Sequence, residues 1–238
     1  MEIKKKTAVM GPHILSLNLS NIHDVFFTSD LHLNHVKIIE YCHRPFKDTE
    51  EMNNILLNNL NNELSKVKHP ILINCGDVIF SNVSTYDEQM DMIKADKIYN
   101  IIGNHDIKNV LQRRQFIPYD ENSRIYWSTE LLVQILDDTN KNKILTQFTV
   151  SHYPHCSGQF FGSFNIHGHL HTPSDIDSYT GSDIDITRKL KETAITYDVG
   201  VDGNDYKPVK LTDILLGKLK NYQIKVIDTE KWNKILSN

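Results

Sequence analysis

Residues 97–106 read KIYNIIGNHD, a compact apolar run followed by a glycine and three polar side chains. Two earlier stretches have the same plan: DVFFTSD at 24–30 and PILINCGD at 70–77. Apolar runs of this length are typical of buried strands and are too short for helices. Helical patterns separate the three stretches, and this alternation predicts βαβ units with a largely parallel sheet.

The clearer of the helical patterns covers residues 48–64. Asp48 has the chemistry of an N-cap, Glu51 follows three residues later, and apolar side chains recur at helical spacing. Residues 85–96 form the second pattern. These two segments are predicted as the helices of the βαβ units.

The second half of the chain has a different pattern of predicted secondary structure. It contains four strand-like runs without long helices between them, at 123–138, 143–155, 164–171 and 193–201. They predict an antiparallel or mixed sheet packed beside the first. We find no internal repeat and no clear linker, so residues 1–238 are interpreted as a single domain.

The composition limits the class of protein. The chain has 238 residues, a net charge of −4 and a pI of about 6.3, a balance that disfavours a surface for long nucleic acid. The N-terminus has no signal-peptide pattern, and no run is apolar enough for a membrane span. Cys42, Cys75 and Cys156 show no paired spacing, which favours a reducing, cytoplasmic environment over a disulfide framework.

Polar residues gather where the predicted strands end. Ligand sites of open α/β sheets lie beyond the carboxyl ends of strands, so we expect these side chains to converge. They are carboxylates, imidazoles and one amide: Asp30, His32, Asp77, Asn104, His105, His152, His169 and His171.

This mixture of donors predicts a metal site. Imidazole with carboxylate suits Mn, Fe or Zn better than Mg or Ca. The seven residues other than His105 are too many ligands for one tetrahedral ion but fit two ions that share a carboxylate. Two such ions can clamp the attacking and leaving oxygens at phosphorus, and a hydroxide bridging them is the natural nucleophile. We expect two divalent ions, with Mn²⁺ favoured and Fe, Zn or Ni as alternatives.

The motifs SDLH, GD, GNHD, SHYP and GHLH occur in that order between Ser29 and His171. Together they resemble the five motif blocks of the calcineurin-like metallophosphoesterase superfamily, and residues 197–209 are similar to its small phage and bacterial members. The resemblance implies a four-layer α/β/β/α sandwich of two mixed β-sheets flanked by helices. It also implies a dimetal site at the edge that the sheets share.

The resemblance also implies roles for individual residues. Each ion would have three ligands of its own: Asp30, His32 and His171 for one ion, and Asn104, His152 and His169 for the other. Asp77 would bridge the two ions. Asn104 and His105 would contact the substrate phosphate, and His105 would protonate the leaving group. In this interpretation Gly168 ends a strand, and His167 stays outside the ligand set.

The sequence departs from one branch of the superfamily. Protein serine/threonine phosphatases follow their GD motif with an aspartate three residues later and then an arginine, where this chain has Phe80 and Ser81. The usual orienting aspartate of the catalytic histidine is therefore missing. Asp106 is adjacent to His105 and is the candidate replacement.

Four further residues admit two interpretations. Arg44 could clamp a phosphate or form a structural ion pair. His35 could contact the substrate or lie exposed in a loop. Asp202 and Asp205 could approach the metals or serve a turn. The substrate-pocket walls are expected in three segments: residues 33–48, 80–90 and 153–163.

The sequence favours a cytoplasmic, dimetal phosphodiesterase that hydrolyses a small, nucleotide-type substrate and does not interact with membranes. A phosphomonoesterase, a Mn-dependent nuclease and a non-catalytic scaffold are the alternatives. Neither the physiological substrate nor the oligomeric state follows from the sequence.

Overall fold

The computed structural model describes residues 6–80, 83–155, 164–173, 195–219, 224 and 227–237. The three predicted strands are present as parallel neighbours, with β4 between β3 and β5. The first sheet has the order β12-β3-β4-β5-β7, and only β12 runs antiparallel to its neighbour. Its strands are β3 (Val25–Thr28), β4 (Ile71–Asn74), β5 (Lys97–Ile101), β7 (Ile125–Ser128) and β12 (Val209–Lys210).

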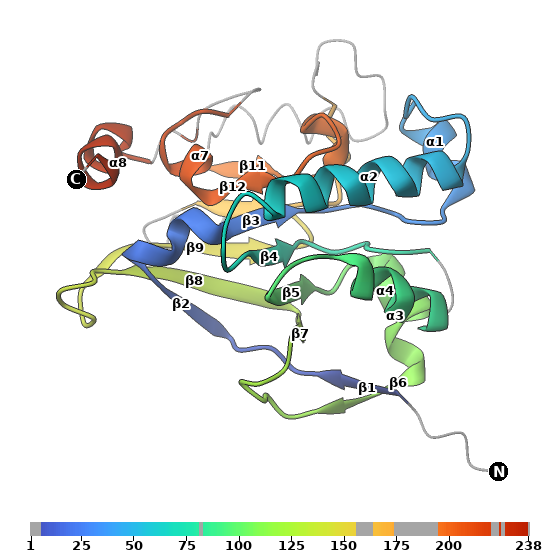
Figure 1. Cartoon of the computed structure of the whole chain (residues 1–238), viewed down its shortest axis with the longest axis horizontal. Coiled ribbons are helices and arrows are strands. Elements are labelled where there is room, and N and C mark those ends of the chain that lie inside the picture. The colour runs from blue at the N-terminus through green and yellow to red at the C-terminus, as the bar shows by residue number, and fades with distance from the viewer. Residues whose placement is uncertain are drawn as a thin grey trace.

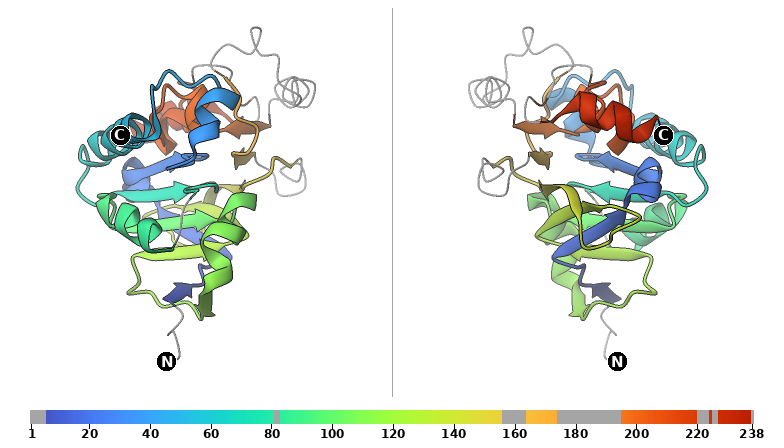
Figure 2. Two further views of the ribbon diagram at one scale, coloured as in Figure 1. Left: turned by 90° about the vertical axis from the view of Figure 1, so that its right-hand side faces the viewer. Right: turned by 90° about the vertical axis from the view of Figure 1, so that its left-hand side faces the viewer.

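The second sheet is mixed, as predicted, but the run at 123–138 is divided between the sheets: its first part forms β7 of the first sheet, and its second part forms β8 of the second sheet. Its order is β11-β10-β9-β8-β2; β8 and β9 are antiparallel, and the other neighbours are parallel. Its strands are β2 (Ile14–Asn18), β8 (Glu130–Leu136), β9 (Ile144–Ser151), β10 (Asn165–His167) and β11 (Thr196–Asp198). A separate parallel pair, β1 (Lys6–Val9) and β6 (Arg114–Ile117), lies at the end of the molecule away from α7 and α8 (Figures 1 and 2).

Helices flank the sheets. The α-helices are α1 (Val36–Tyr41), α2 (Thr49–Leu64), α3 (Val83–Met92), α4 (Asn104–Asn109), α7 (Leu211–Leu215) and α8 (Thr229–Leu236). The 3₁₀ segments are η1 (Leu19–Asp24), η2 (Leu111–Arg113) and η4 (Val201–Gly203). The predicted cap of α2 is confirmed, because the Asp48 carboxylate accepts the Glu51 N–H at 2.8 Å. Among the described residues, no helix combines the length and apolar composition needed to cross a membrane.

Two apolar clusters lie on opposite sides of the first sheet. Because successive strand residues point to opposite faces, Phe27 of β3 packs into the cluster shared by both sheets, while its neighbour Phe26 packs towards the helices. Met52 and Leu56 of α2 belong to the helical cluster, and Figure 1 shows α2 running along this sheet. The expected architecture of two mixed sheets flanked by helices is confirmed.

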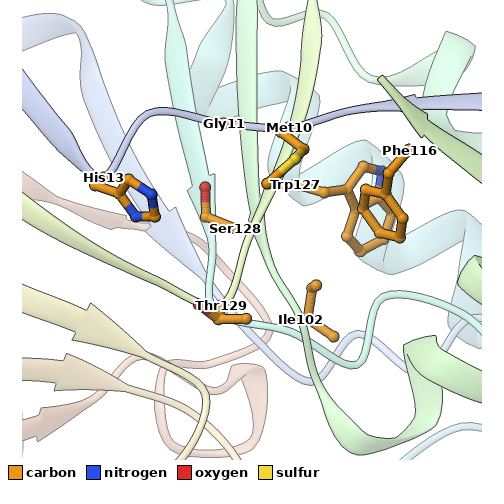
Figure 3. A pocket seen from close by; sticks show the side chains of 8 residues that line it. All are labelled: Met10, Gly11, His13, Ile102, Phe116, Trp127, Ser128 and Thr129. Carbon is orange, nitrogen blue, oxygen red and sulfur yellow. The ribbon is translucent and has the colours of Figure 1, made fainter. Parts of the chain in front are cut away.

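An apolar cavity of about 240 Å³ lies beside the β1–β6 pair. Met10, Ile102, Phe116 and Trp127 are among the residues that line it (Figure 3). The cavity lining includes no carboxylate, so the acidic part of the predicted chemistry has to be sought elsewhere.

Candidate metal centre

The loops after the strands carry the predicted ligands in an unusual backbone conformation. Five of them have positive φ: Asp30 (55°), His32 (48°), Asp77 (54°), His169 (71°) and His171 (49°). Only a few per cent of non-glycine residues adopt this conformation, and it persists where surrounding contacts impose it. Hydrogen bonds between loops impose it here, since the Asp30 N–H donates to the Gly76 carbonyl and the His32 N–H to the Asp77 carbonyl, each at 3.0 Å.

Gly168 permits a close approach between loops of the two sheets. Strand β10 ends at His167, as predicted, and a Cβ at Gly168 would lie 1.9 Å from Ser29 Oγ and 2.5 Å from Asp30 Oδ2. Only a residue without a side chain fits there. The next residue, His169, donates its N–H to Asp30 Oδ2 at 2.8 Å, which ties the two sheets' loops together.

The structure brings the predicted first set of ligands together. Asp30, His32 and His171 form one group with donor atoms within 4.8 Å of one another. Asp30 Oδ1 lies 4.0 Å from His32 Nε2 and 3.8 Å from His171 Nε2. Ligands about 2.1 Å from one ion stand roughly 3–4 Å apart, so these separations suit a shared cation.

Asp77 lies between this set and the second one. Its Oδ2 is 3.7 Å from His32 Nε2 and 3.5 Å from His152 Nε2. His152 Nε2 is in turn 2.9 Å from Asn104 Oδ1, and its ring centroid is 5.0 Å from that of His169. The residues expected for the second ion thus also converge, and Asp77 faces both sets.

Unpaired atoms show that these residues fit a cation. Asp30 Oδ1 and His32 Nε2 are buried, and neither has a hydrogen-bond partner among the residues that the structure describes. Burial, together with nearby His171, lowers the pKa of His32 well below its usual value, and burial raises the pKa of Asp77. Buried polar atoms are nearly always paired in proteins, and a divalent ion would pair with both orphaned atoms.

Two of the predicted histidine ligands are oriented by a polar contact at Nδ1. His152 Nδ1 lies 2.8 Å from the Cys75 carbonyl, and His171 Nδ1 lies 2.7 Å from Asp202 Oδ2. Both rings therefore present Nε2 to the cluster. Metal-binding histidines commonly donate their other N–H to a carbonyl or carboxylate in this manner. By contrast, His167 points Nδ1 at the Gly168 carbonyl at 2.8 Å and belongs to none of the ligand groups among the described residues.

Arg44 does not face the site as a phosphate clamp. It is 3% exposed, and its guanidinium donates to both Asp202 oxygens, at 2.8 and 2.9 Å. It also donates to the carbonyls of Asp30, at 2.7 Å, and Leu31, at 3.0 Å. The expected substrate contact is therefore wrong, because the N–H groups are already engaged, and the alternative of a structural ion pair holds. Asp202 supports both Arg44 and His171, a role beyond the turn that the sequence suggested.

Asp106 does not orient His105. The carboxylate is fully buried and accepts the N–H groups of Asp77 and Gly103, each at 2.9 Å, and of Val78, at 3.1 Å. Burial and the nearby Asp77 charge raise its pKa to about 7, against the opposite effect of the three donors. The sequence suggestion was wrong because the side chain turns back to cap the first turn of α4.

His105 lies at the edge of the cluster, and its ring falls in one of the possible ligand groups, with His32 and Asp77. Its backbone N–H donates to Asp77 Oδ1 at 2.9 Å, its Nε2 lies 4.0 Å from Asp77 Oδ2, and its side chain is 36% exposed. Its ring lies edge-on to that of His32, with centroids 5.1 Å apart. The ring can therefore reach a substrate bound at the cluster.

Aromatic side chains from the expected walls border the site. His35 is half-buried and stacks on Phe80. Tyr153 lies against His169, with ring centroids 4.3 Å apart, and its hydroxyl is 3.3 Å from Asn104 Oδ1. The sequence did not single out Phe80 or Tyr153 as substrate-facing, although both fall in the predicted wall segments. Ser81 and residues 156–163 lie outside the described residues.

Comparison with known proteins places this geometry in a family. The sequence profile named Metallophos, described as calcineurin-like phosphoesterase, matches residues 23–226. The chain belongs to the calcineurin-like phosphoesterase family. Members of this family are metal-dependent phosphoester hydrolases with a binuclear divalent metal centre, and the chain is an enzyme of this kind.

Relatives of this calcineurin-like phosphoesterase include proteins without a described activity. The uncharacterized protein MJ1445 of Methanocaldococcus jannaschii is 30% identical over 190 residues, which cover 79% of this chain and 86% of that protein. A protein of unknown function from Aquifex aeolicus, AQ665, superposes with a TM-score of 0.49 at 21% identity, covering 78% of this chain and 94% of its own. Nuclease MPE of Pseudomonas putida gives a TM-score of 0.34 at 17% identity, covering 63% and 62%.

Proposed function

We propose that this hydrolase is a phosphodiesterase that acts on a small, nucleotide-type substrate. Asp30, His32 and His171 would hold one ion, Asn104, His152 and His169 would hold the other, and Asp77 lies where it could serve both. We favour Mn²⁺, because the three described groups that contain Asp30 or Asp77 offer carboxylate oxygens and imidazole nitrogens; the Cys42 thiol lies near His171 and Asp202 but belongs to none of these three groups. When bound, such ions polarise the phosphoryl group and acidify water.

The observation that supports a preference for diesters is that Arg44 is buried and paired with Asp202. A phosphomonoester has a second negative charge, and bidentate arginine contacts are a common means of holding it. Here the guanidinium is buried and neutralised by Asp202. A diester, with one negative charge, depends less on such a contact. The net charge of −4 favours a small substrate over a long nucleic acid.

His105 acts in this proposal as the proton donor to the leaving group. Its backbone is fixed by Asp77, while its ring stays exposed enough to approach the ester oxygen. A general acid has to lie beside the metal ligands without being used as one. An alkoxide leaving group needs that proton, whereas p-nitrophenolate can depart without it.

The test compares Mn²⁺-loaded protein on three substrates: p-nitrophenyl phosphate, bis-p-nitrophenyl phosphate and a dinucleotide. We expect kcat/KM to be higher for bis-p-nitrophenyl phosphate than for p-nitrophenyl phosphate. Removal of the metal with a chelator should abolish activity on all three substrates. His105→Ala should lower kcat for the dinucleotide by about 10²–10⁴-fold, and much less for bis-p-nitrophenyl phosphate. The control is His69→Ala, whose side chain is 66% exposed and paired with Asp96.

Each result has a distinct meaning. Faster cleavage of the monoester would show a phosphomonoesterase, and faster cleavage of a long oligonucleotide than of the dinucleotide would show a nuclease. Equal losses on both diesters, or loss of bound metal measured by mass spectrometry, would refute His105 as the proton donor. No hydrolysis with Mn, Fe, Zn or Ni would contradict the proposed reaction altogether.

A further inference from the structure

Phe80 is an exposed apolar side chain beside the metal centre. The residue is 41% exposed, although it comes only three positions after Asp77. Its ring stacks on that of His35, with centroids 4.2 Å apart and planes 14° from parallel. It meets the His105 ring edge-on, with centroids 5.6 Å apart. An aromatic ring left in water next to carboxylates and imidazoles is a common feature of a binding surface.

The backbone holds this ring in place. The Phe80 N–H donates to the Leu33 carbonyl at 2.8 Å, and Leu33 pairs with Ile79 as neighbouring strands do. His35 is tied to the same loop, because its N–H donates to the His32 carbonyl at 3.0 Å. The aromatic pair is therefore organised before any ligand arrives, which reduces the entropic cost of binding.

We propose that Phe80, supported by His35, is the stacking surface for a nucleobase of the substrate. The inference rests on the proposed function, because it places the nucleoside of a nucleotide diester. Bases stack on Phe and His rings, and every base has a suitable face, so the surface recognises nucleobases as a class. Because Phe80 contacts His105, the proposed proton donor, a base stacked on Phe80 would lie on the leaving-group side of phosphorus.

The position of Phe80 explains a departure of the sequence. The protein serine/threonine phosphatases, the branch from which the sequence departs, have an aspartate three residues after GD. Here the same position presents a flat apolar ring to His105. The substitution exchanges a hydrogen-bond partner of the histidine for a surface that a base can cover.

The test is a binding comparison on the Mn²⁺-loaded protein. Adenosine 5′-monophosphate and ribose 5-phosphate share a phosphate and a sugar and differ by the base. We expect calorimetry to show the nucleotide binding roughly tenfold or more tightly. Phe80→Leu keeps apolar volume but removes the flat face, so the affinity ratio should fall towards one, whereas Phe80→Tyr should retain it.

Phe116 offers a matched control. It is 43% exposed, close to the value of Phe80, and it lines the apolar cavity beside β6 (Figure 3). Phe116→Leu should leave the affinity ratio unchanged. Equal affinities in the wild type, or a ratio that survives Phe80→Leu, would overturn the inference. If the protein cleaves diesters but binds the nucleotide no more tightly than ribose 5-phosphate, the inference about Phe80 fails and the proposed function stands. If the affinity ratio behaves as expected but no diester is cleaved, the proposed function fails and the base-stacking surface stands.

Discussion

Two buried carboxylates, Asp106 and Asp202, support the metal centre from different sides and by different means. Asp106 accepts three backbone N–H groups and so fixes the main chain that carries Asp77. Asp202 pairs with the guanidinium of Arg44 and with the imidazole of His171. One carboxylate shapes a loop, and the other orients a ligand while it neutralises a buried cation.

Loss of either carboxylate would leave a different kind of buried group without its partner. Without the Asp106 carboxylate, the backbone N–H donors stay buried without an acceptor, and their desolvation is no longer offset by hydrogen bonds. Removing one member of a buried ion pair leaves an uncompensated charge, which costs more. The two residues should therefore be separable by experiment, although both are buried and both lie next to predicted ligands.

The largest expected effect is that of Asp202→Ala. It leaves the guanidinium of Arg44, whose side chain is 0% exposed, without its counter-ion. We expect the free energy of unfolding of the metal-free protein to fall by about 4 kcal/mol in urea denaturation. Glu63→Ala breaks an exposed pair with Lys66 and should cost less than about 1 kcal/mol. A similar small loss for Asp202→Ala would mean that the backbone carbonyls alone satisfy Arg44.

A smaller loss of stability is expected for Asp106→Asn. The amide has one acceptor oxygen, and its N–H₂ would face an N–H donor that the carboxylate now satisfies. We expect about 2 kcal/mol of destabilisation, because one of the three buried N–H donors loses its acceptor. Asp48→Asn, which accepts a single N–H at the start of α2, should change stability by only a few tenths of a kcal/mol. Equal effects of the two variants would refute the three-donor role of Asp106.

Replacing both members of the ion pair separates folding from metal binding. The double variant Arg44→Met with Asp202→Leu removes both charges, so we expect it to regain at least half of the stability lost in Asp202→Ala. His171 still loses the partner of its Nδ1, so one Mn²⁺ should bind about 10–100-fold more weakly in a calorimetric titration. The affinity of the second ion is the internal control. Unchanged binding of both ions would show that Asp202 serves the fold alone.

The smallest effect is expected on a side of the site that neither carboxylate supports. Tyr153→Phe removes a hydroxyl that lies 3.3 Å from Asn104 Oδ1, and the residue is 52% exposed. We expect about threefold weaker Mn²⁺ binding. Tyr41→Phe, at a residue 64% exposed on α1, should have no effect on the metal. A tenfold or larger loss would show that Tyr153 contributes to the site as strongly as the buried carboxylates.

Much of the first sheet could be predicted because its signals are local. Short apolar runs and turn residues marked β3, β4 and β5, and an N-cap at Asp48 marked the start of α2. The second helix was less well placed, since α3 covers Val83–Met92 and the pattern had suggested residues 85–96. Helix ends depend on contacts outside the helix, such as the bond from the Asp96 N–H to the Pro70 carbonyl.

The candidate metal ligands could also be predicted from the sequence, but the hydrogen bonds and ion pairs that hold them in place could not. Carboxylate, imidazole and amide groups are properties of single side chains, and their places after strands follow from the strand pattern. The partner of Arg44 lies 158 positions away, so no local pattern shows it. Asp106 was assigned to its sequence neighbour His105, yet its carboxylate reaches back to Asp77, a residue 29 positions earlier.

The types of donor, their order along the chain and the strand ends that carry them follow from the amino-acid sequence, because they depend on side-chain chemistry and local periodicity. The orientation of His171 by Asp202, the burial of the Arg44 cation and the exposure of Phe80 beside His105 follow from the folded structure. Each of these depends on loops from different strands meeting at one edge, where the packing of the whole fold sets the distances.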